Sequence, residues 1–258
     1  MVDGKRYVAG EPCWADVTTP DVEAAKRFYG ELFGWTFADS GPEFGGYVMC
    51  SVDGRTAAGI TPPMPGAGDA PPVWSTYLWS DDAAATAKLV EAGGGTVLMP
   101  PMEVGDTGTM LVATDPGGAA FGVWQPGAHR GAEVFDEPGG ICWAEVNTRE
   151  PGVDAFYKSL FGYEQEQIGD GSFDYTAWML GGEAVAGRLT MTSPDWDGMP
   201  PHWMIYFVVP DADAAAEKAV ALGGSIGAPP FDSPHGRIAV LSDPHGATFS
   251  AIDITRKS

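Results

Sequence analysis

The chain has 258 residues, of which 44% are hydrophobic and 11% aromatic, a composition typical of folded globular domains rather than of disordered chains. Its formal net charge of −21 disfavours nucleic acid and anionic membranes as partners, since both require basic patches. The sequence contains no apolar stretch of the roughly 20 residues that a membrane span needs, and no apolar segment follows Met1–Arg6. We therefore predict a cytoplasmic chain without a secretory signal.

The first elements in chain order are a strand, a helix and three more strands. We expect the strand at 12–18 and the helix at Pro20–Phe33, with Thr19 as its N-cap and Gly34 as its stop. The three short strands that follow are expected near 35–38, 46–52 and 56–61.

The same order of elements restarts after a Pro/Gly-rich connector at Thr61–Pro72. A strand is expected at 74–79 and a helix at 82–92, which Gly93–Gly95 ends. Strands should follow near 96–99, 108–114 and 119–125, and we place the Met-Pro-Pro-Met run Met99–Met102 in a loop. Each half of this region is therefore a βαβββ unit.

The second half of the chain repeats the first. Trp14 returns at position 143, a shift of 129 residues, and Asp115 returns at position 243, a shift of 128. Solenoid repeats are only about 20–50 residues long, so we interpret the repeat as a duplicated domain. The further helices should lie near 150–161 and 211–222. We predict a first domain at 1–126, a linker at 127–138 and a second domain at 139–258.

Three cysteines, Cys13, Cys50 and Cys142, are spread along the chain without a Cys-x-x-Cys spacing. Such a sparse, odd set argues against both a disulfide scaffold and a zinc site. We expect these cysteines to be small buried residues in a reducing compartment.

Two motifs recur in each copy: a helix that ends in Phe-Tyr-x-x-Leu-Phe-Gly, and a late Asp-Pro-x-Gly turn. With the four βαβββ units, they resemble the vicinal oxygen chelate superfamily of glyoxalases, bleomycin-resistance proteins and extradiol dioxygenases. The chain looks similar to two-domain glyoxalase-like proteins of high-GC bacteria. The resemblance implies an α+β fold of two tandem glyoxalase-like domains, in which curved, cup-like mixed sheets carry their helices outside and the active site lies inside the cup.

The resemblance also implies four metal-ligand positions in each cup, normally His, Glu or Gln. In the first domain they align with Trp14, Ala58–Thr61, Ser75 (or Trp74) and Gly122. In the second they align with Trp143, Ala186–Leu189, Met204 and Ser250. These residues are poor ligands for divalent ions, so we predict no metal and no other cofactor. Conventional glyoxalase and extradiol reactions, which use the ion, are disfavoured, although a shifted site that includes Asp16 or Glu145 stays open.

Strand alternation predicts which side chains line the cups. Each cup should contain several aromatic rings and one carboxylate, which suits a flat, partly apolar ligand. The candidate catalytic acid–base residues are Asp16 and Glu145. The candidate ligand-binding residues are Trp14, Tyr77, Trp79, Trp124, Trp143, Asn147, Met204, Tyr206 and Ser250. The histidines are weaker candidates, with His202 and His235 ahead of His129 and His245.

Three functions stay open at this point. The first is metal-independent binding of an aromatic or cationic small molecule, such as an antibiotic or a metabolite. The second is a hydroxylase-, lyase- or isomerase-like enzyme that acts on such a molecule through Asp16, Glu145 or a shifted metal site. The third is a non-catalytic interaction protein whose cups are filled. A small molecule is the expected partner, and we expect a monomer, with a dimer as the alternative.

Overall fold

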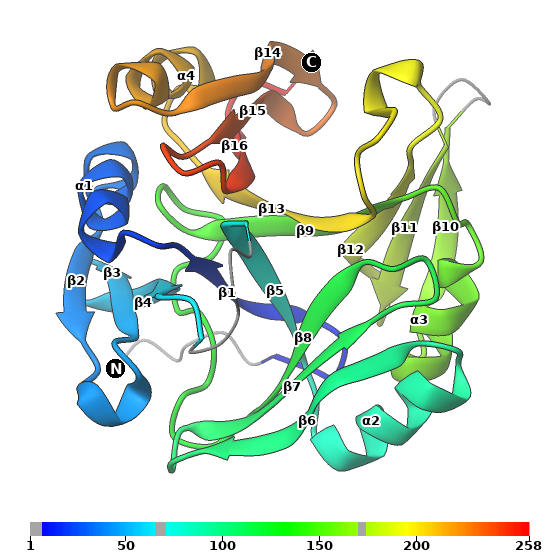
Figure 1. Cartoon of the computed structure of the whole chain (residues 1–258). Helices are drawn as coiled ribbons and strands as arrows, with labels where there is room; N and C mark the ends of the chain where they lie inside the picture. The colour runs from blue at the N-terminus through cyan, green and yellow to red at the C-terminus, as the bar shows by residue number, and fades with distance from the viewer. Residues whose placement is uncertain (1–6, 65–70, 170–173, 258) are drawn as a thin grey trace.

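The computed structural model describes residues 7–64, 71–169 and 174–257. These residues form two eight-stranded sheets and four α-helices (Figure 1). Among their helices, none combines the length and apolar character needed to cross a membrane. The expectation for Met1–Arg6, and part of the one for the connector at Thr61–Pro72, lie outside the described residues.

The first sheet joins two βαβββ units side by side at β1 and β5. Its strands, in spatial order, are β2 (Thr36–Asp39), β3 (Val48–Val52), β4 (Arg55–Thr61), β1 (Pro12–Thr18), β5 (Val73–Trp79), β8 (Ala120–Pro126), β7 (Gly108–Thr114) and β6 (Thr96–Val104). Strands β1 and β5 are antiparallel, whereas β1–β4 and β5–β8 are parallel pairs. Helix α1 (Val22–Phe33) follows β1, and α2 (Ala83–Ala92) follows β5.

The second sheet has the same order and the same mixture of pairings. Its strands are β10 (Glu164–Ile168), β11 (Tyr175–Leu180), β12 (Glu183–Thr190), β9 (Ile141–Thr148), β13 (His202–Val208), β16 (Thr248–Asp253), β15 (Gly236–Ser242) and β14 (Ser225–Ser233). Helix α3 (Val153–Phe161) follows β9, and α4 (Ala212–Ala221) follows β13. The four βαβββ units and the α+β architecture of two tandem domains are thus confirmed.

Helix α1 begins later than the sequence predicted. Asp21 is the N-cap, because its carboxylate Oδ1 accepts a hydrogen bond from the Ala24 N–H at 2.9 Å. Thr19 Oγ1 accepts from the Asp21 N–H instead, at 3.4 Å, and Pro20 precedes the helix. The prediction of a Thr19 cap was therefore wrong, since Asp caps a helix as well as Thr does. Gly34 ends the helix in the left-handed region, at φ 73°, as expected.

The Met-Pro-Pro-Met run is also different from the prediction. Met99–Met102 lies within β6, which continues to Val104, and not in a loop. Its pairing with β7 shifts register between Met99 and Met102. An edge strand tolerates proline at such a bulge because one side of the strand forms no ladder hydrogen bonds.

The two domains share one continuous hydrophobic core. Helix α1 lies beside α4, and α2 beside α3, in the space between the domains (Figure 1). The centroid of the Phe33 ring of α1 lies 5.0 Å from the ring centroid of Phe207 and 5.6 Å from that of Phe249, and both residues belong to the second sheet. The helices therefore cover the face of each sheet opposite the cup and join the domains to each other.

The two recurring motifs meet across this domain interface. The Tyr29 hydroxyl of the first Phe-Tyr motif donates to Asp243 Oδ2 of the second Asp-Pro-x-Gly turn, at 3.0 Å. The Tyr157 hydroxyl donates in the same way to Asp115 Oδ2, at 3.1 Å. Each buried tyrosine also accepts a hydrogen bond from a tryptophan of its own domain, Trp74 or Trp203. The motifs that identified the repeat thus hold the interface together with approximate two-fold symmetry.

Candidate functional site

The first cup is built around Asp16, in the centre of the first sheet. Asp16 lies opposite Ser75 on β5 and Gly59 on β4, and Trp14 lies opposite Tyr77. These pairs place Trp14, Asp16 and Tyr77 on one face, as strand alternation predicted. The carboxylate is only 5% exposed.

A chain of hydrogen bonds connects the polar groups of this cup. The Trp14 indole N–H donates to the Tyr47 hydroxyl at 2.8 Å, and that hydroxyl donates to Asp16 Oδ2 at 3.2 Å. Burial raises the pKa of Asp16 to about 7, and hydrogen bonds from Tyr47 and Tyr77 oppose this shift. Near neutral pH, Asp16 can therefore hold or release a proton.

The second cup repeats this arrangement around Glu145. The Trp143 indole N–H donates to the Tyr175 hydroxyl at 2.8 Å, and the Tyr206 hydroxyl donates to Glu145 Oε1 at 2.9 Å. Glu145 is 5% exposed, and burial raises the pKa of its carboxyl group. Tyr47 and Tyr175 were not predicted from the sequence, although they occupy equivalent positions in the two copies, 128 residues apart.

Tyrosine side chains fill the space at three of the eight positions that would carry metal ligands. A Cβ atom added at Gly59 would overlap the Tyr47 hydroxyl, and one at Gly187 would overlap the Tyr175 hydroxyl. A Cβ at Gly122 would overlap the Tyr77 ring. No side chain that donates to a metal fits at these three positions. The residues present do not fit the divalent ion that the superfamily resemblance implies, because the described residues of each cup offer one carboxylate with phenol and indole neighbours.

A shifted metal site at Asp16 or Glu145 lacks further ligands in the part of the chain that the structure describes. Within it, no group of three or more His, Cys, Asp or Glu side chains lies close enough to hold an ion. Of the three cysteines, Cys13 and Cys50 are buried, and Cys142 is half-buried. The prediction of buried cysteines is therefore confirmed for Cys13 and Cys50 but not for Cys142.

Residues after β8 cover the first cup. The ring of His129 packs edge-on against Trp14, with 4.4 Å between ring centroids, and against Trp124, at 5.6 Å. The Trp124 indole N–H donates to the His129 carbonyl oxygen at 3.0 Å. Burial lowers the pKa of the imidazole to about 4, so the ring is neutral at pH 7. A histidine that the sequence placed in the linker therefore closes this cup.

The second cup is more open. Trp143 and Tyr206 are half-buried, whereas their counterparts Trp14 and Tyr77 are 4% and 7% exposed. At the place equivalent to His129, Lys257 is exposed. The aromatic surface that His129 covers in the first cup is thus accessible in the second.

The other predicted site residues fall in two groups. Asn147, Met204 and Ser250 are buried on the cup face of the second sheet, where Met204 pairs with Glu145 and Ser250 with Tyr206. Trp79 does not join the Asp16 network: its ring stacks on Tyr7 at 5.6 Å, and its indole N–H donates to Asp81 at 3.1 Å. His202 reaches Asn147 in the second cup, whereas His235 and His245 are exposed in turns.

Two further surface depressions lie between the domains and not in the cups. One, of about 520 Å³, is lined by residues of α2 and α3 such as Leu89 and Phe156. The other, of about 180 Å³, lies between α1 and α4 beside Leu32 and Lys218. Among the described residues, neither is lined by a tryptophan or a tyrosine, unlike the cups.

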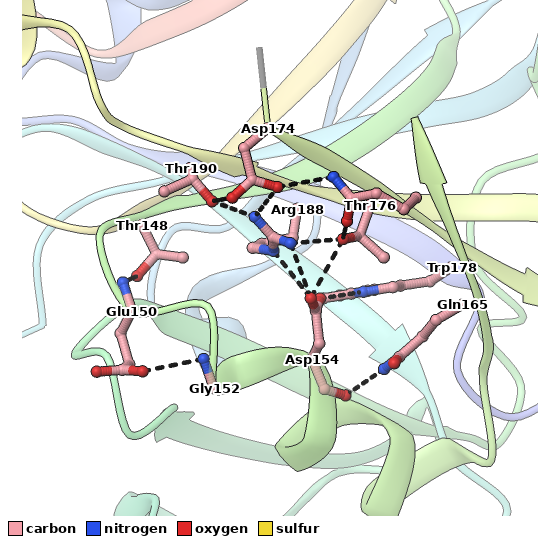
Figure 2. A network of polar contacts seen from close by, with 11 residues as sticks. Thr148, Glu150, Gly152, Asp154, Gln165, Asp174, Thr176, Trp178, Arg188 and Thr190 are labelled. Carbon is pink, nitrogen blue, oxygen red and sulfur yellow. Dashed lines mark hydrogen bonds and ion pairs between the residues drawn. The ribbon is translucent and has the colours of Figure 1, made fainter. Parts of the chain in front are cut away.

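A buried ionic network occupies the helix side of the second sheet (Figure 2). The Arg188 guanidinium lies between Asp154 Oδ2, at 2.9 Å, and Asp174 Oδ1, at 3.1 Å, and is 2% exposed. The Trp178 indole N–H donates to Asp154 Oδ1 at 2.7 Å. All these groups are paired with one another and point away from the cup, so we interpret the network as structural.

Comparisons with known proteins place this geometry in a family. A profile of the Glyoxalase/Bleomycin resistance protein/Dioxygenase superfamily matches residues 13–123 and 155–250. The chain is 43% identical to "Putative glyoxylase CFP32" of Mycobacterium tuberculosis, with 98% of each chain covered. It is 40% identical to "Anthracycline biosynthesis protein DnrV" of Streptomyces peucetius, with 96% of this chain and 95% of that one covered.

Solved structures share the fold at low identity. The Mn(II)-bound glyoxalase from Novosphingobium aromaticivorans superposes with a TM-score of 0.63 at 16% identity, over 97% of this chain and 86% of that one. The 2,3-dioxygenase LapB from Pseudomonas sp. KL28 gives 0.64 at 15% identity, over 96% and 93%. With the sequence profile and the close relatives, these matches show that the chain belongs to the glyoxalase/bleomycin resistance protein/dioxygenase superfamily.

Proposed function

We propose that the protein binds a planar aromatic small molecule, without a metal ion, in its second cup. The observation that carries the proposal is the arrangement around Glu145: a buried carboxylate, the Tyr206 and Tyr175 phenols and the Trp143 indole, all on one sheet face. Flat rings provide stacking surface for a flat ligand, and a few convergent polar groups orient it.

The second cup is the better binding site because its aromatic side chains are accessible. Trp143 and Tyr206 are half-buried, so part of each ring surface is available to a ligand. In the first cup, the His129 ring already occupies the edge of Trp14. A ligand there would compete with the protein's own side chain.

The names of the relatives support an aromatic ligand. Two relatives, DnrV and the 39% identical DauV of Streptomyces sp. (strain C5), are named anthracycline biosynthesis proteins. Anthracyclines contain a planar, hydroxylated quinone ring system, which has the size and polarity that an aromatic pocket with a few hydrogen-bonding groups accommodates. We therefore propose hydroxylated polycyclic quinones as the ligand class.

Metal independence is supported by the chemistry of the cup. The tyrosine hydroxyls occupy the space that ligand side chains would need at Gly59 and Gly187. The remaining carboxylate is hydrogen-bonded to phenols, and these contacts supply the polar groups of the site without an ion.

A second candidate is acid–base catalysis on the same ligand. Burial raises the pKa of Glu145 above its ordinary value, which favours a role of the carboxyl group as a proton donor or acceptor. This candidate requires that Glu145→Gln abolishes turnover of a hydroxylated quinone while its binding survives. If the protein only binds the ligand, neither the wild type nor Glu145→Gln should turn it over.

The binding proposal is tested with 2-hydroxyanthraquinone and chelator-treated protein. We expect saturable quenching of the tryptophan fluorescence, with the same affinity after addition of Mn²⁺. Trp143→Ala should weaken binding at least about fivefold, since stacking on a large ring contributes about 1–3 kcal/mol. The matched variant of the first cup, Trp14→Ala, should leave the affinity nearly unchanged. Absence of quenching, or binding that depends on added metal, would reject the proposal.

A further inference from the structure

Asn147 and His202 form a pair with a defined orientation in the second cup. The His202 Nδ1 atom lies 2.9 Å from the Pro200 carbonyl oxygen. A carbonyl oxygen only accepts hydrogen bonds, so Nδ1 must carry the hydrogen. Burial lowers the pKa of His202, which keeps the ring neutral and leaves its Nε2 atom without a hydrogen.

The bare Nε2 atom then fixes the amide of Asn147. The Asn147 Nδ2 atom lies 3.1 Å from His202 Nε2, so the amide N–H donates to the ring nitrogen. The reverse orientation would place two acceptors against each other. Asn147 Oδ1 is thereby turned away from His202, and it is buried without a hydrogen-bond partner among the described residues.

The free oxygen lies on the cup face. Asn147 is two residues beyond Glu145 and four beyond Trp143 on β9, and alternate residues of a strand share a face. The Asn147 side chain is 7% exposed, so its oxygen cannot rely on bulk water. A buried acceptor without a partner costs about 1–3 kcal/mol, which a ligand with a matching donor would recover.

The first cup has no such pair. Thr18 and Val73 take the places of Asn147 and His202 in the aligned strands, and they pair with each other in the same register. Valine offers no polar atom to orient a neighbour. The Asn–His pair is therefore a difference between the cups and not a requirement of the fold.

We propose that Asn147 Oδ1 selects ligands that carry a hydroxyl or N–H donor at the edge of the aromatic ring, and that His202 positions the amide for this contact. The inference rests on the proposed binding function and adds a chemical requirement to it. Ligands with only an acceptor or a methyl group at that edge leave Asn147 Oδ1 unpaired and bind more weakly.

The test compares 2-hydroxyanthraquinone with 2-methylanthraquinone, in which a methyl group of similar size replaces the hydroxyl. Affinities are measured by fluorescence quenching at pH 7, where His202 is neutral, with thermal unfolding as a check on each variant. The wild type should prefer the hydroxyl compound about tenfold, the effect expected of one buried hydrogen bond. Asn147→Leu should lose that preference by weakening the hydroxyl compound alone, whereas Asn147→Asp, which keeps an oxygen acceptor, should retain it.

Two further variants separate positioning from packing. His202→Phe removes the acceptor of the Asn147 amide and keeps a ring of similar size, so the preference should fall while the methyl compound binds as before. Thr18→Val in the first cup should change neither affinity. Equal weakening of both compounds by Asn147→Leu, or no change in either, would overturn the inference and leave the binding proposal intact. Failure of both compounds to bind the wild type would reject the binding proposal, and this inference with it.

Discussion

The two cups share the same central residues but differ in the residues around them. In both, a tryptophan, a tyrosine and a buried acid share the cup face, and a tyrosine–aspartate hydrogen bond crosses to the other domain. The first cup is then closed by His129, whereas the second is left accessible and holds the Asn147–His202 pair. The common residues belong to the shared fold, and the differences are the basis of our proposal that the second cup is the binding site.

The helix sides of the sheets differ as well. Arg188 of β12 is ion-paired with Asp154 and Asp174, where the first domain has the buried Ile60 in the equivalent strand. At equivalent positions on the helix side, the first domain therefore buries a hydrophobic side chain and the second buries an ion network. The second domain depends on exact polar geometry where the first depends on apolar burial.

The largest effect is expected at this network. Arg188→Leu would leave Asp154 and Asp174 without their buried cation, and breaking one side of a buried ion pair costs about 3–5 kcal/mol. Its counterpart Ile60→Leu changes only shape and should cost less than about 1.5 kcal/mol. Urea denaturation of both variants measures the contrast. A loss below about 1 kcal/mol for Arg188→Leu would show that the network contributes little.

The next effect is a pH dependence that originates in the first cup. Burial raises the pKa of Asp16 to about 7, so the folded protein holds this proton more tightly than the unfolded chain. The contribution of Asp16 to stability is therefore fully present below about pH 4, the usual Asp pKa, and is lost as the pH rises to about 7.

Asp16→Asn should remove this part of the pH dependence of the unfolding free energy. We expect the free energy of unfolding of the wild type, relative to the variant, to fall on the order of 4 kcal/mol between pH 4 and pH 7. Burial shifts the pKa of His129 in the opposite direction, but this residue is present in both proteins and its effect cancels in the difference. A difference that is constant with pH would contradict a proton held by Asp16.

A smaller and symmetric effect is expected at the domain interface. Tyr29→Phe and Tyr157→Phe each remove one buried hydrogen bond to an aspartate, which should cost about 1.5–3 kcal/mol. Because the two contacts are equivalent, the two losses should agree within about 0.5 kcal/mol. Clearly unequal losses in thermal or urea unfolding would show that the interface is not the symmetric part of the molecule.

The smallest effect on stability is expected for the cover of the first cup. His129→Ala removes a ring from Trp14 and Trp124, and should lower the unfolding free energy by about 1 kcal/mol. It should also expose the first cup, so that the number of 2-hydroxyanthraquinone molecules bound per chain rises from one to two in a calorimetric titration. An unchanged stoichiometry would mean that His129 does not close a second binding site.

The repeat and the strand patterns predicted most of the framework. Period-two alternation was enough to place Trp14 and Asp16 on one face, and the glycines after the helices marked where α1 and α3 end. Tyr47 was missed because its contact with Trp14 and Asp16 depends on the pairing of β3 with β4, which shifts register at Cys50. The residue pattern of a single strand does not predict such a register shift between two strands.

The differences between the cups depend on longer-range geometry. The path that brings His129 onto Trp14 is fixed by contacts such as the Ala132 N–H to the Cys13 carbonyl, which join the segment after β8 back to β1. The meeting of Asn147 with His202 requires the antiparallel register of β9 and β13. Both features depend on contacts between segments that are distant in the sequence, so composition and local residue patterns do not predict them.

The central claim is that the second cup binds a hydroxylated aromatic ring while the first is closed by the protein itself. A crystal structure of the protein grown with 2-hydroxyanthraquinone tests this claim most directly. The account predicts the ring against Trp143 and Tyr206, with its hydroxyl within hydrogen-bond distance of Asn147 Oδ1, and His129 still packed on Trp14. A ring bound in the first cup, or in the depression beside Leu89 and Phe156 with an empty second cup, would contradict it.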